Sequence, residues 1–147
     1  MKKLNSVTVA LWANRFVALL LGVLVFTLPL LLQWYCQFRE LTALEQNAIT
    51  IAFYCCAVVV MVALWSMDTT LRTVRTGQVF IRANVRRIRI IRWCCGIVGL
   101  ICIPAACCYY PLIFMVIIMV FLFLVINVVC QVLEAAVSIR EENDLTI

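Results

Sequence analysis

Nine cysteines are the most chemically versatile side chains of this 147-residue chain, because thiols can bind metals and undergo redox reactions. None of them forms a C-x-x-C pair, and the chain has no histidine, the commonest transition-metal ligand. Most of the cysteines lie within apolar runs, where a thiol packs as a small hydrophobic group. We therefore predict no metal and no cofactor. A disulfide from Cys36 to Cys107 or Cys108 stays open as a separate hypothesis.

Residues 68–92 carry seven arginines and a single acid, Asp68. Such a cluster is typical either of nucleic-acid binding or of a membrane surface. Hydrophobic segments long enough to cross a bilayer flank it on both sides, and a short basic loop between two spans stays in the cytoplasm. We predict that this loop fixes the orientation of the protein and attracts anionic lipid headgroups, without direct nucleic-acid binding.

The composition indicates an integral membrane protein. Hydrophobic residues make up 67% of the chain and charged residues 13%, which is too few to cover a water-exposed surface. A spanning helix needs about 20 mostly apolar residues. We predict one membrane domain over residues 1–147, an all-α bundle of four transmembrane helices at about 14–33, 48–67, 93–110 and 112–133. An even number of spans places both termini on the same side of the membrane. With the basic loop after the second span in the cytoplasm, both termini of this multi-pass cell-membrane protein are predicted to be cytoplasmic.

The connections between these spans have their own patterns. Residues 33–47 form the predicted outer loop, and residues 68–76 continue the second helix into the cytoplasm. Beyond Gly77, Ile81, Val85, Ile88 and Ile91 recur at helical spacing, while Arg82, Arg86 and Arg89 lie on another face. This pattern predicts a short amphipathic cytoplasmic helix before the third span. Its arginine face suits contact with membrane lipids, and a partner-binding helix would show the same pattern.

The fourth span carries a polar stripe on its inner half, because Asn127, Gln131, Glu134 and Ser138 recur at 4-3-4 spacing. Polar groups at this depth are costly against lipid, so the stripe should face other helices or water. Interhelical hydrogen bonding is the plainer interpretation, and a path for an ion or solute is the alternative. Arg15 lies at the same predicted depth as Glu134, so we predict that these two side chains pair.

Two patches resemble a known family. The first is Gly77-Gln78-Val79-Phe80, followed by Asn84 and by Arg86-Arg87-Ile88-Arg89 before a span, and the second is the tail, residues 141–147. Both are similar to the bacterial four-helix membrane proteins called domain of unknown function 2975. Members often have proline and a threonine or acid where this chain has Val79 and Ile81. Many members are encoded beside a small helix-turn-helix regulator, and the resemblance carries over no catalytic residue.

A catalytic site would require a nucleophile, an acid–base pair or a metal cage, and the sequence contains none of these patterns, so we predict no enzyme. The resemblance instead implies a sensor or regulator that engages a cytoplasmic DNA-binding partner. The residues expected to bind this partner or lipid are Phe80, Arg82, Asn84, Arg86, Arg89, Glu141, Glu142, Asn143, Asp144, Leu145 and Ile147. The alternative is a small transporter or pore subunit that forms a homo-oligomer, with the polar stripe lining its path.

Overall fold

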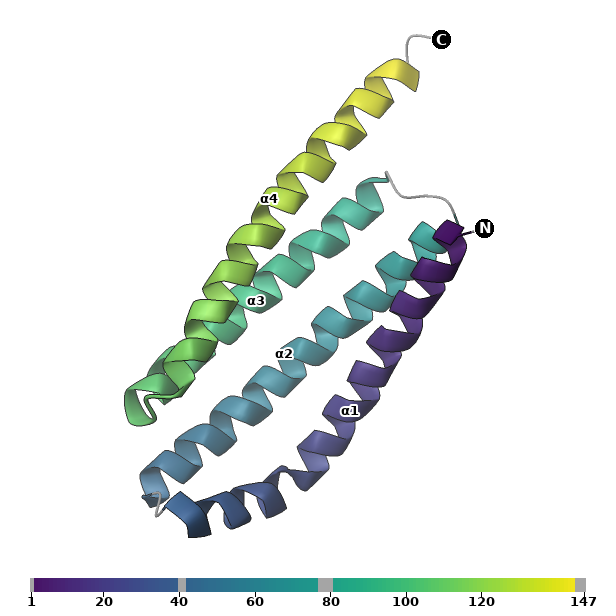
Figure 1. The fold of residues 1–147 in the computed structure, drawn as a ribbon. Coiled ribbons are helices and arrows are strands. Elements are labelled where there is room, and N and C mark those ends of the chain that lie inside the picture. Colours follow the sequence, from purple (N-terminus) through teal and green to yellow (C-terminus); the bar gives the residue numbers. More distant parts are fainter. Residues whose placement is uncertain (1, 40–41, 77–80, 145–147) are drawn as a thin grey trace.

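The computed structural model describes residues 2–39, 42–76 and 81–144, all organised around four α-helices. They are α1 (Lys2–Arg39), α2 (Ala43–Arg75), α3 (Arg82–Cys108) and α4 (Leu112–Asp144). Each helix is long and apolar enough to cross a membrane, which agrees with the four predicted spans. Both chain ends lie at the same end of the molecule (Figure 1), as expected for an even number of crossings.

The helices extend well past the predicted spans. α2 continues through Asp68 to Arg75, as predicted. The predicted outer loop over residues 33–47 is wrong, because α1 runs to Arg39 and α2 already starts at Ala43. Glu45 caps this start, since its Oε2 accepts the backbone N–H of Thr42 at 2.8 Å. Most of the expected loop is therefore helix.

The separate amphipathic helix is also absent from the residues that the structure describes. Arg82 to Arg92 form the first turns of α3, and the helix continues from them into the apolar segment without interruption. No glycine or proline stands between Arg82 and Gly96 to break the backbone hydrogen bonds. An amphipathic surface segment and a membrane span thus share one rigid axis.

The four helices of the predicted bundle are arranged as an open row. α1 packs against α2, α2 against α3, and α3 against α4, with no close backbone contact between α1 and α4 among the described residues. Figure 1 shows the two outer helices on opposite sides of the row, with the last part of α1 turned away from its first part. Pro29 lies within α1 and removes a backbone donor there.

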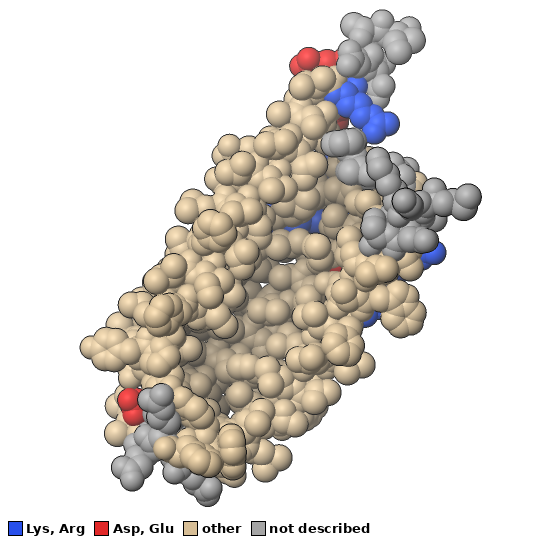
Figure 2. Space-filling model, in the orientation of Figure 1, with Lys and Arg blue, Asp and Glu red and all other residues tan. Residues whose placement is uncertain are grey.

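Small residues form the contacts inside this row, and large apolar residues face outward. Ala52 and Ala57 of α2 and Val98, Cys102 and Ala105 of α3 are buried. Small side chains let helix backbones approach closely within a membrane. Most large hydrophobic side chains are exposed, and Figure 2 shows a broad uncharged band with charged groups gathered toward the ends. This surface is the one expected for lipid contact.

Candidate functional site

Most described arginines lie at one end of the molecule, which we call the basic end (residues 2–15, 68–76, 81–92 and 134–144). Here α3 starts beside the last turns of α4. The backbone N–H of Asn84 donates to the Ile81 carbonyl at 3.0 Å, which closes the first turn of α3. Val85 then packs with Cys130 and Val137 of α4 in a small buried cluster. This apolar contact holds the arginine face of α3 against α4.

Two ion pairs cross from α3 to α4 beside this cluster. Arg82 binds Glu141 through two hydrogen bonds, with Nε 2.7 Å from Oε1 and Nη2 2.6 Å from Oε2. Arg89 donates to Glu134 seven residues further along the helix. The hydrogen bonds from Arg82 lower the pKa of the Glu141 carboxyl, so this group stays ionised to a more acidic pH. Both pairs are partly exposed and sensitive to salt.

A cavity of about 340 Å³ lies between the same two helix ends. We call it the arginine–glutamate cleft, and its lining consists of Arg82, Val85, Arg86, Arg89, Glu134, Val137, Ser138 and Glu141. Arg86 lies between the two ion-paired arginines and is exposed. Among the described residues it makes no hydrogen bond or ion pair. Three guanidiniums and two carboxylates leave one surplus positive charge in the cleft.

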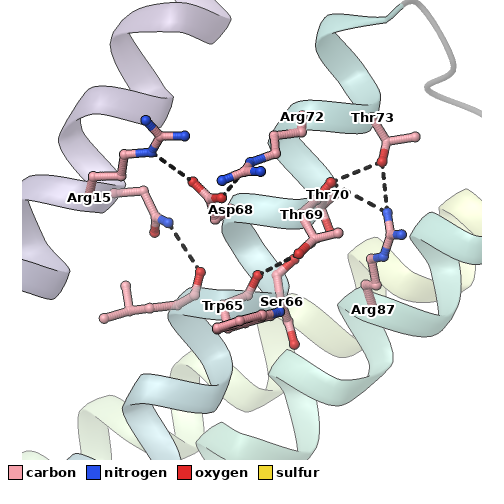
Figure 3. A network of polar contacts seen from close by, with 11 residues as sticks. Arg15, Trp65, Ser66, Asp68, Thr69, Thr70, Arg72, Thr73 and Arg87 are labelled. Atoms are coloured by element: carbon pink, nitrogen blue, oxygen red, sulfur yellow. Dashed lines mark hydrogen bonds and ion pairs between the residues drawn. The ribbon is translucent and has the colours of Figure 1, made fainter.

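The opposite side of α3 is fixed to α2 by Arg87. Its Nη1 donates to Thr73 Oγ1 at 2.8 Å and to the Thr69 carbonyl at 3.4 Å, as Figure 3 shows. The same nitrogen lies 3.3 Å from Oδ1 of Asn84, a side chain that is only 3% exposed. Successive arginines of α3 therefore have different tasks. Arg86 faces the cleft, and Arg87 anchors the helix.

The polar stripe of α4 faces the arginines of α3. Asn127 Oδ1 accepts from Arg92 Nη1 at 2.7 Å, and Glu134 accepts from Arg89. Ser138 donates to the carbonyl of Ala135 in its own helix, and Gln131 is exposed. Two of the four stripe residues thus make the interhelical hydrogen bonds that the plainer interpretation expected.

The predicted pairing of Arg15 with Glu134 is wrong. Arg15 lies on α1, and its Nε is 3.4 Å from Oδ1 of Asp68 on α2. Glu134 lies on α4 and pairs with Arg89, and no backbone contact joins α1 to α4. Equal depth in the membrane is therefore not sufficient for a contact, because the two helices lie on opposite sides of the row.

Nearly the whole chain is similar to one known protein family. The family described as "Protein of unknown function (DUF2975)" matches residues 4–147, which is nearly the whole chain. The chain belongs to the DUF2975 family. No curated protein and no solved structure gave a significant match.

Some of the predicted residues of this DUF2975 protein lie outside the described part. Phe80, Leu145 and Ile147 are outside it, and so are the side chains of Asn143 and Asp144. Asn84, Arg82, Arg86, Arg89 and Glu141 come together around the start of α3, and Glu142 is exposed on the last turns of α4.

Sequence analysis did not anticipate two polar contacts of the DUF2975 chain. These are the Arg87–Thr73 hydrogen bond and the Asp68 carboxylate shared by Arg15 and Arg72. The sequence does contain a pattern that could have predicted them. Thr69 and Thr73 are four residues apart near the end of α2, and Asp68 is four residues before Arg72, so hydroxyls and a carboxylate lie among the arginines.

The described cysteines do not form a metal-binding site. Within the part of the chain that the structure describes, no group of three or more cysteine, aspartate or glutamate side chains could hold an ion. Cys107 and Cys108 are free thiols, and the side chain of Cys36, the third member of the disulfide hypothesis, lies outside the described residues. The sulfur atoms of Cys56 and Cys102 lie 3.9 Å apart.

Proposed function

We propose that this DUF2975 protein is a non-enzymatic membrane regulator that binds a cytoplasmic protein at the arginine–glutamate cleft and the adjoining tail. The observation that carries the proposal is Arg86. It is an exposed guanidinium in an open cleft, between two arginines that already have glutamate partners. A guanidinium offers five N–H donors in a fixed plane, which suits recognition of a carboxylate.

The two ion pairs support this assignment because they fix the charge pattern around Arg86. Glu141 holds Arg82 and Glu134 holds Arg89, so the cleft presents a negative edge on α4 and a single available positive group on α3. A partner must then offer an acidic side chain to Arg86 and avoid acids opposite Glu134 and Glu141. Such a pattern selects partners by repulsion as well as by attraction.

The partner class is an acidic surface of a small soluble protein, and a helix-turn-helix regulator has the size and cytoplasmic location to provide it. This location requires the basic end to face the cytoplasm, as the positive-inside rule expects for arginine-rich loops. A cysteine introduced as Arg75→Cys at the end of α2 tests the orientation. Because native thiols such as Cys107 are also exposed, labelling is mapped by peptide. The peptide that contains position 75 should resist a membrane-impermeant thiol reagent in intact cells and react after the cells are opened.

The transporter alternative receives less support from the geometry. A conducting path needs polar groups that face an open route, and Asn127 and Glu134 are instead hydrogen-bonded to α3. Gln131 is exposed on α4 and would have to line a path with another copy of the chain. Flux through reconstituted vesicles that is abolished by Gln131→Leu would favour the alternative.

Site-specific crosslinking tests the regulator proposal. A photoreactive amino acid is placed at Ser138 in one variant and at Arg75 in a matched variant, since both positions are exposed at the basic end but only Ser138 lines the cleft. This keeps Arg86 in place, and we expect one soluble protein to crosslink at position 138 and not at position 75. An unlabelled variant lacking residues 143–147 should lose co-purification of that same protein.

Two results would contradict the proposal. One is the recovery of no soluble protein at either position, and the other is equal crosslinking at both positions, which indicates charge attraction without a defined site. Arg86→Gln serves as the matched point variant, because it removes the charge and keeps a polar side chain. It should weaken co-purification while the yield and helicity of the purified protein stay unchanged.

A further inference from the structure

A second cavity at the basic end lies between α1 and α2, away from the arginine–glutamate cleft. Its volume is about 380 Å³. Arg15 of α1 and Arg72 of α2 stand at its charged side, and Ala18, Met61 and Leu64 form an apolar side. Trp65 completes the wall and is 77% exposed. The cavity thus joins a cationic rim to an apolar floor.

The charges of this rim are unbalanced. Asp68 is the only acid in the lining, and both guanidiniums share it, with Arg72 Nε at 2.7 Å from Oδ2 and Arg15 Nε at 3.4 Å from Oδ1. Two positive groups and one negative group leave one surplus positive charge. Each guanidinium approaches the carboxylate through its Nε, at 3.4 Å for Arg15 and 2.7 Å for Arg72, and a guanidinium has four further N–H donors on its terminal nitrogens.

The exposure of the three groups shows where a ligand would enter. The side chains of Arg15 and Arg72 are 56% and 63% exposed, whereas that of Asp68 is 18% exposed. Figure 3 shows Arg15 reaching from α1 and Arg72 from α2 toward the same Asp68. The carboxylate therefore lies beneath and between two guanidiniums, and holds them side by side at the open surface.

The location of the cavity specifies the ligand further. Arg15 and Asp68 lie at the edges of the spans predicted over residues 14–33 and 48–67, where headgroups meet hydrocarbon. A phosphodiester carries one negative charge, which matches the surplus, and its two non-bridging oxygens can each accept from one guanidinium. Apolar chains attached to it would follow Ala18, Met61 and Leu64 into the membrane.

We propose that Arg15 and Arg72 bind the phosphodiester of an anionic glycerophospholipid, with Trp65 beside the headgroup and an acyl chain along the apolar floor. Asp68 does not contact the ligand, and its carboxylate neutralises one of the two guanidinium charges, so that one surplus positive charge is left for the phosphodiester. A soluble phosphodiester has the same charged group without the acyl chains, so the experiment must separate these two sources.

Native mass spectrometry of the purified full chain in nonionic detergent provides the measurement. The probes are phosphatidylglycerol, zwitterionic phosphatidylcholine and soluble glycerophosphoglycerol. We expect phosphatidylglycerol to bind in preference to both other probes. Arg15→Gln combined with Arg72→Gln should reduce its bound population by about tenfold, since two charge-assisted hydrogen-bond sites are lost.

Two further variants separate this site from general charge attraction and from misfolding. Arg140→Gln is the matched control, because it removes an exposed arginine of the basic end that lines neither cavity and should leave binding unchanged. Asp68→Asn removes the competing carboxylate and should strengthen binding of phosphatidylglycerol. A damaged fold cannot produce such a gain, so this variant keeps the proposal testable if the double variant folds poorly.

Three results would overturn the proposal. Equal loss of bound phosphatidylglycerol in the double variant and in Arg140→Gln would show nonspecific attraction. Binding of glycerophosphoglycerol at the same strength as the lipid would assign the site to a soluble phosphodiester and remove the role of the apolar floor. Weaker binding of phosphatidylglycerol in Asp68→Asn would show that the carboxylate does not compete with the lipid for the two guanidiniums, contrary to the proposed charge balance.

Discussion

The hydrogen bond between Arg87 and Thr73 is the contact that we expect to fix α3 against α2 at the basic end. Thr73 Oγ1 has two roles, since it donates to the Thr69 carbonyl at 2.9 Å and accepts from Arg87 Nη1 at 2.8 Å. Thr73→Val replaces the hydroxyl by a methyl group of similar size and keeps the β-branched shape. The substitution therefore removes both hydrogen bonds with little change in packing.

Thr69 offers a matched control one helical turn away. Its hydroxyl donates to the Trp65 carbonyl at 2.9 Å, and among the described residues no side chain is hydrogen-bonded to it. Thr69→Val thus loses the same intrahelical hydrogen bond but leaves Arg87 in contact with Thr73. The difference between the two variants isolates the bond from the guanidinium.

The expected difference follows from the strength of a hydrogen bond to a charged group, about 1.5–3 kcal/mol when buried. Thr73 and Arg87 are half-buried, and Arg87 keeps its longer contacts to the Thr69 carbonyl and Asn84. We therefore expect Thr73→Val to lower the free energy of unfolding by about 1–2 kcal/mol more than Thr69→Val, a factor of roughly 5–30 in the equilibrium constant.

Unfolding in mixed micelles, followed by loss of helicity as the fraction of denaturing detergent rises, measures this difference. An Arg87→Met variant completes the cycle, because Thr73→Val should cost little more than Thr69→Val once the guanidinium is gone. Equal destabilisation by the two valine variants in the presence of Arg87 would refute the reasoning. α3 would then be held at its start by other contacts.

Three further predictions concern the other helix contacts. Iodine should join Cys56 to Cys102, whose sulfur atoms lie 3.9 Å apart, and non-reducing peptide mapping that finds no such link would contradict the α2–α3 packing. Gly99→Ala should be tolerated, because the added Cβ lies 3.6 Å from a Met119 atom, whereas Gly99→Leu should cost about 1–3 kcal/mol in the same unfolding assay. Reversing either Arg89 or Glu134 should lower the yield of folded protein, and exchanging both charges should restore it. An exchange that restores nothing would show that the pair has no structural role.

The hydropathy of the chain was sufficient to predict the number of helices, because each apolar segment must satisfy its backbone inside the hydrocarbon. The predicted spans 93–110 and 112–133 are separated by Pro111 alone, and such a short connection requires the two helices to be neighbours, as α3 and α4 are. Helix ends were harder to predict. The segment from Arg82 to Arg92 contains no helix-breaking residue, so surface helix and span merge into α3.

The partners of the charged residues could not be derived from depth alone. Arg15 and Glu134 have the same predicted depth, but four antiparallel helices can be arranged so that the first and last never meet. The contact of Arg15 with Asp68 depends on α1 packing along α2, which is a property of the helix order in space. The spacing of polar residues along a helix shows which of its faces is polar, but it does not show which other helix packs against that face.

The position of α3 in the row gives the basic end its main mechanical property. α3 is held to α2 through Arg87 on one side and to α4 through Arg82 and Arg89 on the other. Arg86 is the next residue before Arg87 on the same rigid helix, so displacement of this turn by a bound partner would act on both interfaces. A bound partner can change the balance between two positions of a helix only if it binds one position more tightly than the other. The exposed ion pair from Arg82 to Glu141 is weak enough to rearrange, whereas the Arg87 contacts to α2 and the apolar cluster of Val85 with α4 are more sheltered. The last turns of α4, beyond Val137, are therefore the part expected to move when the cleft is occupied.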